Sequence, residues 1–329
     1  MPAVTGIRRA SVIAVSNPKR KHHITPAFYL RGFACVEPGK ESFIWVYERG
    51  LPYRPGYMKK GVYNPCQRPV TATGFEWDYY AFEKPDGSGW DYETYENALE
   101  KIEDAAKPAI QRLRRHELVE GADRMAMATY MAVMLKRVPR RREWADEMWP
   151  EFIRQFEQGA KVLEQLDTHE RNTDPSNTKR LANIARMRAE YTGLMNQYKS
   201  ADSIPRHILL PILISQSKIP PALYDMTWRL LICDKDNFFL TSDNPLWFDE
   251  EQGIGNQRLE VSFPISSDAV LVISRKAVAE GVFGAGRRVV EEINRRSATR
   301  ANRHLYSRQP EAWVVKLLSH AYTPRPIVR

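Results

Sequence analysis

The chain has 329 residues, of which 43% are hydrophobic and 11% aromatic, and this composition excludes a largely disordered protein. The formal charge of +9 is concentrated at the ends: residues 1–36 carry six Lys or Arg and no acid, and residues 286–329 carry ten Lys or Arg against three Glu. Such basic ends suit contact with nucleic acid, but solubility alone explains them equally well.

Three widely spaced cysteines, Cys35, Cys66 and Cys233, and the absence of a CxxC motif exclude a disulfide framework and the usual thiolate zinc site. No stretch reaches the roughly 18 apolar residues that a membrane span needs, so we expect no membrane partner. A reducing cytoplasm is the expected compartment. The sequence does not indicate the oligomeric state.

The first half of the chain changes from strand-like to helical patterns. Residues 1–20 are predicted to form a flexible basic arm, and the aromatic and β-branched segments 42–48 and 75–83 to form strands. From Tyr92 to about Lys218, apolar residues recur at helical spacing, interrupted by a polar linker at residues 167–178.

Strand-like segments then return at residues 227–233, 237–242, 259–265 and 269–275, and a final helix is predicted over residues 287–307. The glycine-rich segment 281–286 matches no phosphate-binding spacing and is interpreted as a loop. This order predicts an α+β fold in which a central helical section (about 92–218) is flanked by strand-rich N- and C-terminal segments that form one mixed or antiparallel sheet. The predicted organisation is one α+β domain over 21–310 with a C-terminal extension at 311–329.

The segment "HHITPAFYLRGF" places two histidines at a predicted helix start, with Thr25 as the N-cap and Pro26 as the first helical residue. A cation is disfavoured beside a helix N-terminus, so His23 should favour the neutral imidazole of a base or metal ligand. Adjacent side chains diverge, so we expect one of His22 and His23 at a reacting centre and the other in the scaffold. Purely structural hydrogen bonding by both histidines is the competing explanation.

The helical section supplies further candidates. Glu96 and Glu103 are seven residues apart, hence on nearly one line of a helix, where they could ligate a metal or act as a base; a surface ion pair between Glu103 and Lys107 is the alternative. Arg137 emerges beside an apolar helix face, so its guanidinium needs a carboxylate or a bound phosphate as partner. Arg140 follows the next helix break, and both arginines could instead meet helix C-terminal carbonyls.

The segment "TSDNP" runs a buried strand into Ser242, Asp243 and Asn244, and strand ends often present reactive groups. A structural turn explains the same residues. Asn294, on the apolar side of the final helix, must find internal hydrogen bonds, as a core tie or as a site residue.

These motifs, together with "FPIS" and "IN…HLYS", resemble a mainly bacterial family known as domain of unknown function 4238, over residues 21 to about 307. The resemblance implies one compact domain with a shared site, and no established activity. It favours convergence of the histidine pair, the two arginines, Asp243 and Asn294.

The hypothesis from the sequence is a phosphodiester hydrolase, specifically a nuclease. A neutral histidine would act as general base, the two arginines would bind the phosphate, and Asp243 with Glu96 or Glu103 would orient groups or hold Mg²⁺ or Mn²⁺. Ser242, Asn244 and Asn294 would support this set. Two alternatives remain open: a non-catalytic nucleic-acid-binding or regulatory module, and a nucleotide-binding protein.

Overall fold

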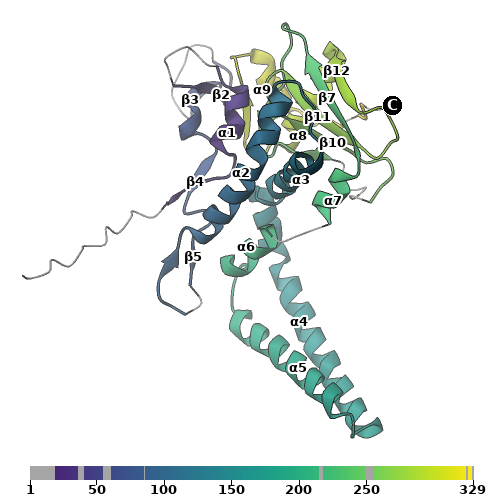
Figure 1. Ribbon diagram of the computed structural model, residues 1–329. Coiled ribbons are helices and arrows are strands. Elements are labelled where there is room, and N and C mark those ends of the chain that lie inside the picture. The colour runs from purple at the N-terminus through teal and green to yellow at the C-terminus, as the bar shows by residue number, and fades with distance from the viewer. Residues whose placement is uncertain are drawn as a thin grey trace, which may run out of the picture.

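The computed structural model describes residues 19–35, 41–54, 61–84, 86–214, 218–248, 253, 255–323 and 325–327 (Figure 1). Most of the predicted flexible arm lies outside these residues. The α+β class is confirmed, because strand-rich ends flank a helical section. The helices are α1 (Ala27–Leu30), α2 (Thr94–Arg114), α3 (Gly121–Lys136), α4 (Pro139–Thr173), α5 (Thr178–Tyr198), α6 (Arg206–Ile214), α7 (Ile219–Tyr224), α8 (Arg287–Arg300) and α9 (Ala312–Ser319).

The described strands are divided among four sheets rather than gathered in one. In chain order they are β1 (Lys21–His23), β2 (Phe43–Glu48), β3 (Cys66–Pro69), β4 (Phe75–Trp77), β5 (Phe82–Glu83), β6 (Trp90–Asp91), β7 (Thr227–Cys233), β8 (Thr241–Ser242), β9 (Trp247–Phe248), β10 (Glu260–Pro264), β11 (Ala269–Ser274), β12 (Gly281–Ala285) and β13 (His304–Ser307). Two larger sheets have the orders β12-β7-β11-β10-β9 and β3-β2-β13-β8, and the pairs β1-β4 and β5-β6 form two-stranded sheets.

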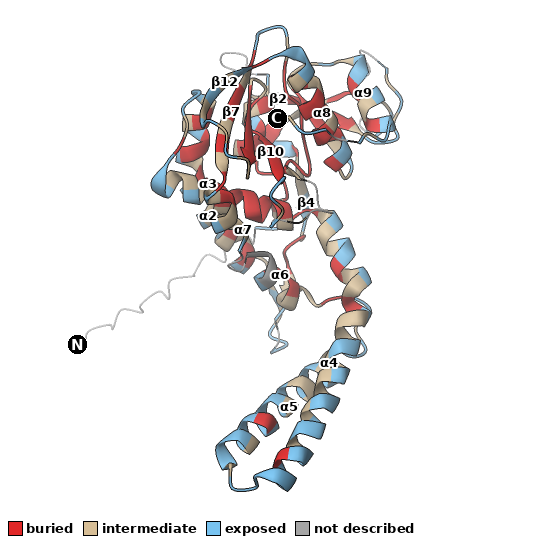
Figure 2. Ribbon diagram, turned by 90° about the vertical axis from the view of Figure 1, so that its right-hand side faces the viewer, coloured by how far each residue is buried: buried red, intermediate tan, exposed pale blue. Residues whose placement is uncertain are grey.

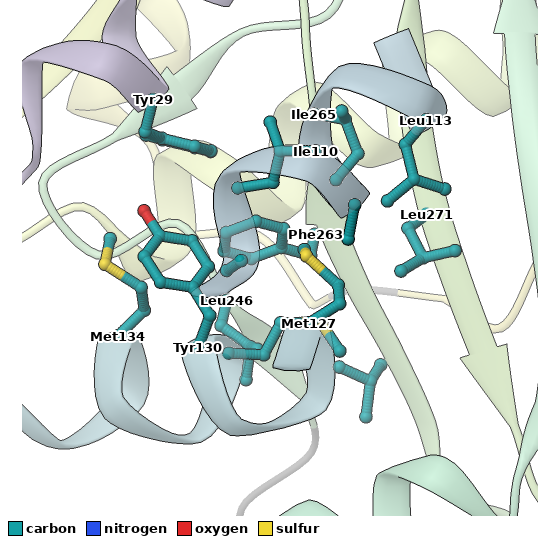
Figure 3. Packing of buried hydrophobic residues seen from close by; sticks show 14 of the residues in the cluster. Tyr29, Ile110, Leu113, Met127, Tyr130, Met134, Leu246, Phe263, Ile265 and Leu271 are labelled. Carbon is teal, nitrogen blue, oxygen red and sulfur yellow. The ribbon is translucent and has the colours of Figure 1, made fainter. Parts of the chain in front are cut away.

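The five-stranded sheet is covered on both faces, which explains why every residue of β10 and β11 is buried. One face packs against α2 and α3, where Met127, Tyr130 and Met134 meet Phe263 and Leu271 (Figure 3). The other face packs against α8. The methionines at helical spacing are therefore core residues.

The four-stranded sheet is antiparallel and joins strands from both ends of the chain. Its strand β13 lies within the segment that the sequence predicted to be helical. Its central pair joins β2 to β13, with His304 opposite Glu48 and Tyr306 opposite Val46. The residues that alternate with these, such as Tyr47 and Leu305, pack against α8 and α9. The opposite face of the sheet is thereby left for the cleft described below.

Helices α4 and α5 form a hairpin that projects from the body and is mostly exposed (Figures 1 and 2). The predicted linker at 167–178 is wrong in its first part, because α4 continues to Thr173 and the turn occupies only residues 174–177. The polar residues there form a solvated helix end, stabilised by ion pairs such as Asp167 with Arg171.

Several other predicted boundaries are also wrong. The strand predicted at 75–83 is two short strands, because Asp78 adopts a left-handed turn with φ 55°. The glycine-rich segment 281–286 is mostly strand β12, paired in parallel with β7. The cap of α1 is Pro26 rather than Thr25, and no side chain caps that helix. The final helix ends at Arg300, and residues 304–307 form β13.

Candidate functional site

A cleft of about 1210 Å³ opens on the face of the four-stranded sheet that α9 does not cover. Side chains two residues apart on a strand share a face, so Val46 and Glu48 of β2 and His304 and Tyr306 of β13 all line it. Its other walls come from segments distant in sequence: residues 24–25, 72–77, 139–143, 298–303 and 320–322.

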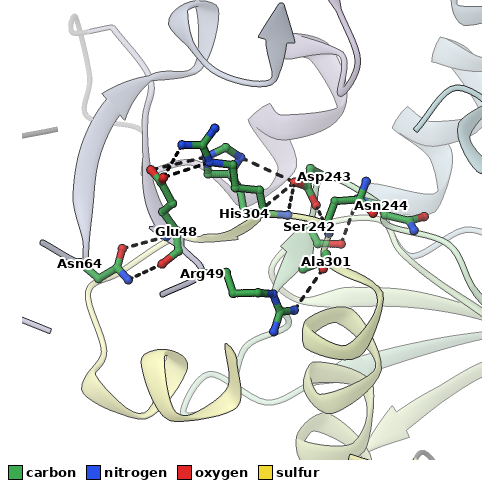
Figure 4. Close-up of polar contacts among 10 residues, drawn as sticks. Glu48, Arg49, Asn64, Ser242, Asp243, Asn244, Ala301 and His304 are labelled. Carbon is green, nitrogen blue, oxygen red and sulfur yellow. Dashed lines mark hydrogen bonds and ion pairs between the residues drawn. The ribbon is translucent and has the colours of Figure 1, made fainter. Parts of the chain in front are cut away.

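His304 lies on the floor of this cleft between two carboxylates (Figure 4). Its Nδ1 is 3.6 Å from Oδ2 of Asp243, and its Nε2 is 3.9 Å from Oε2 of Glu48. The other Glu48 oxygen, Oε1, accepts hydrogen bonds from Arg303 at 2.9 and 2.6 Å. The imidazole stacks on Tyr306 and remains 23% exposed, so a ligand in the cleft can reach it.

Asp243 is held in place by main-chain groups. Its carboxylate accepts hydrogen bonds from the N–H groups of Asn302 at 2.8 Å, Arg303 at 2.8 Å and His304 at 2.9 Å. These bonds turn the chain between α8 and β13, and they explain why α8 ends at Arg300 rather than continuing to the predicted end at residue 307. Asp243 therefore fixes the backbone at His304 and places a carboxylate beside the imidazole.

Positive groups border the cleft on two sides. Arg68 of β3 has a buried Nε that finds no hydrogen-bond partner among the described residues, and Arg140 is exposed on the first turn of α4. Helix α4 begins at this wall with Pro139 and has no side-chain cap, so the positive end of its dipole also lies beside the cleft. Two acids, Glu76 and Glu143, line the cleft as well, so its charge is mixed.

The two predicted histidines lie outside the residues that line this cleft. His22 is fully buried; its Nε2 lies 2.8 Å from the Lys19 carbonyl and 3.0 Å from the Tyr92 carbonyl, and its Nδ1 accepts from the Tyr80 N–H at 2.8 Å. Both ring nitrogens are thus occupied by main-chain groups, as expected of a scaffold residue.

A buried polar cluster lies beside His22. It consists of His23, Tyr80, Glu96, Glu103, Tyr130 and Arg137. Arg137 is 1% exposed and donates to Glu103 at 2.7 Å and to the Ile24 carbonyl at 2.6 Å. Four buried atoms of the cluster have no hydrogen-bond partner among the described residues: His23 Nε2, Tyr80 OH, Tyr130 OH and Arg137 Nη2.

Burial perturbs the titration of two members of this cluster. Desolvation lowers the pKa of His23 to about 4, helped by the charges of Lys21 and Arg137. Desolvation raises the pKa of Glu96 to about 7, against the opposing charge of Arg137. Near neutral pH His23 is therefore uncharged and Glu96 holds its proton for much of the time.

The remaining predicted residues serve the core. The Asn294 side chain accepts from the Leu240 N–H at 2.8 Å and donates to the Phe238 carbonyl at 2.9 Å, which ties α8 to the strand segment before Ser242. The Ser242 hydroxyl accepts from the N–H of Asn244, and both residues are buried. The ten predicted residues thus divide among the cleft (Arg140 and Asp243), the buried core (Ser242, Asn244 and Asn294) and the cluster with its neighbour His22.

Glu48, Arg68 and His304 were missed by the reasoning from sequence. The motif "HLYS" contains His304 and was noted only as part of the family resemblance. Its period-two alternation could have indicated a strand with His304 and Tyr306 on one face. No local signal pairs His304 with Glu48, since the two lie at opposite ends of the chain.

Among the described residues, no group of three or more His, Cys, Asp or Glu side chains is placed to hold a metal ion. None of the three cysteines forms a disulfide bond. Within the same part of the chain, no helix is both long enough and apolar enough to cross a membrane.

The protein is therefore of the α+β class, and its cleft is lined by β2 and β13, two strands that are far apart in the sequence. Its sequence matches the family model DUF4238, described as "Protein of unknown function", over residues 21–311, and the chain belongs to that family. No curated protein and no solved structure matches it significantly.

Proposed function

We propose that the protein is a phosphodiester hydrolase, a nuclease in particular, whose reaction takes place in the cleft. The observation that supports this most is the placement of His304. Its imidazole lies between the carboxylates of Asp243 and Glu48 on the cleft floor, and it shares the cleft with Arg68 and Arg140. A positioned imidazole beside guanidinium groups suits attack on a phosphate diester.

In this mechanism Asp243 orients the ring through Nδ1, and Nε2 of His304 removes a proton from the attacking water. The water oxygen forms the new P–O bond as the bond to the leaving oxygen breaks, and the protonated imidazole returns the proton to that oxygen. Arg68, Arg140 and the N-terminus of α4 stabilise the negative charge that develops on the phosphoryl oxygens.

This proposal moves the base from the predicted histidine pair to His304. Asp243 keeps its predicted orienting role and Arg140 its predicted phosphate contact. Arg137 would act indirectly, because the Ile24 carbonyl that it binds belongs to a residue lining the cleft. Cleavage with and without Mg²⁺ or Mn²⁺ measures whether a divalent metal ion takes part in the reaction.

The test measures cleavage of single- and double-stranded DNA and RNA by the wild-type protein and by His304→Asn, with and without Mg²⁺ or Mn²⁺. The matched control is His116→Asn, since His116 also pairs with an aspartate, Asp268 at 3.0 Å, but outside the cleft. We expect about a 100-fold or larger loss for His304→Asn and none for the control. Equal cleavage by all three proteins would refute the assignment of the base.

A second candidate is non-catalytic nucleic-acid binding, which the ten Lys or Arg against three Glu at residues 286–329 favour. Not all of these are available to a ligand, because Arg296 is buried and paired with Glu260 at 2.5 Å. Salt-sensitive binding without cleavage would support this candidate.

The absence of disulfides suits the reducing cytoplasm that we propose as the compartment.

A further inference from the structure

Trp77 exposes a large apolar ring at a charged cleft. It lies on β4 and lines the cleft. The residue is 68% exposed, more than any other large hydrophobic residue in the described part of the chain. Leaving an indole in water forgoes the stabilisation that its burial would provide. Tryptophan is enriched at binding surfaces, where its ring offers a large contact area.

The ring is held rather than free to swing. Strand β4 pairs with β1, so that Trp77 lies opposite Lys21 and Phe75 opposite His23. The Phe75 ring is perpendicular to the indole at 5.9 Å between centroids. On the Phe75 ring rests the Lys21 ammonium, 4.1 Å from its centroid, and that ammonium also donates to the Thr71 carbonyl. The indole is therefore supported by one perpendicular aromatic contact, and its 68% exposed surface leaves room for a ligand to stack on it.

The cleft that Trp77 borders is larger than the roughly 300–1,000 Å³ typical of sites for small ligands, and it also contains Arg68, Arg140 and His304. An aromatic platform beside cationic groups is the combination by which proteins hold unpaired nucleotides, since a base stacks while its phosphate is neutralised. Bases inside a duplex are already stacked and cannot use such a platform.

We propose that Trp77 stacks on an unpaired nucleobase whose phosphate occupies the cleft beside His304, so that the substrate of the proposed hydrolase is single-stranded nucleic acid. This inference rests on the proposed function for the fate of the phosphate. Its binding step can be measured without any cleavage.

The experiment measures fluorescence anisotropy of labelled 12-nucleotide single strands and of a 12-base-pair duplex, all in the His304→Asn protein so that no cleavage interferes. The added variants are Trp77→Ala, Trp77→Phe and, as matched control, Trp90→Ala, because Trp90 is 55% exposed but lies outside this cleft. Circular dichroism and thermal unfolding verify that each variant is folded.

We expect Trp77→Ala to raise the Kd for single strands by about 5- to 100-fold, Trp77→Phe to retain most of the affinity, and Trp90→Ala to leave it unchanged. Competition by mononucleotides tells a strand from a free nucleotide as the source of the base. We expect the 12-nucleotide strands to bind more tightly than mononucleotides do. Equal affinities would indicate a free nucleotide as the ligand and would overturn the strand as substrate. Unchanged binding by Trp77→Ala, equally tight duplex binding, or no binding at all would overturn the platform itself. Failure of the cleavage assay alone would affect only the hydrolase proposal.

Discussion

Replacing Glu96 with Gln, and separately His23 with Gln, should change the pH dependence of stability in opposite directions. Both side chains belong to the buried polar cluster, where burial raises the pKa of Glu96 from 4.5 to about 7 and lowers the pKa of His23 from 6.5 to about 4. The folded protein binds the Glu96 proton more tightly than the unfolded chain does. The Glu96 contribution to the free energy of unfolding therefore falls as the pH rises from 4.5 to 7.

For His23 the sign is reversed. The folded protein binds its proton more weakly, so its contribution is lost as the pH falls from 6.5 to 4. Each shift, at about 1.36 kcal/mol per pKa unit and discounted for partial exposure, corresponds to about 2–3 kcal/mol. Between pH 4.5 and 6.5 the two contributions nearly cancel in the wild-type protein.

Urea unfolding of the three proteins at pH 4.5, 5.5 and 6.5 measures this cancellation directly. As the pH rises from 4.5 to 6.5, the free energy of unfolding of Glu96→Gln should increase by about 2–3 kcal/mol relative to that of the wild type. Over the same pH range, the free energy of unfolding of His23→Gln should decrease by a similar amount. Titrating groups that do not interact with Glu96 or His23 contribute equally to all three curves. Three parallel curves would refute the assigned burial of both groups.

Three further substitutions test other parts of the structure. Glu103→Gln leaves the buried Arg137 guanidinium without its anionic partner, and its free energy of unfolding in urea should drop by about 3–5 kcal/mol. Asn294→Ala removes two buried hydrogen bonds from the side chain to main-chain groups, and the free energy of unfolding in urea should drop by roughly 2–3 kcal/mol. Its nucleic-acid binding should be unchanged. Gly74→Ala places a Cβ 2.7 Å from the Thr25 carbonyl oxygen, so its Tm should fall further than that of Gly61→Ala, where φ is also positive but the space is open.

Local periodicity predicted the helices well, because an apolar stripe such as that through Met127, Tyr130 and Met134 records which face packs against the core. It failed where a distant group decides the local structure. The sequence from Arg287 onward continues to favour a helix, yet the carboxylate of Asp243 binds the N–H groups of Asn302 and its neighbours and turns the chain into a strand.

The candidate site shows the same limit. The histidine pair stands out in the sequence because its signal is local, whereas His304 becomes distinctive only when β13 pairs with β2 and brings Glu48 beside it. Burial of Arg137 could be expected from its position on an apolar helix face. That its anionic partner is Glu103 and not a bound phosphate follows from the packing of α2 against α3, which the sequence does not reveal.

The β2–β13 pairing sets an order of events during synthesis. Strand β2 leaves the ribosome well before β13, because helices α2 to α7 lie between them in the chain. At about 5–20 residues per second, an interval of roughly 250 residues lasts on the order of 10–50 s, during which one edge of β2 has no partner. A nascent chain that lacks β13 has no cleft, so the proposed activity would be withheld until β13 has left the ribosome and paired with β2.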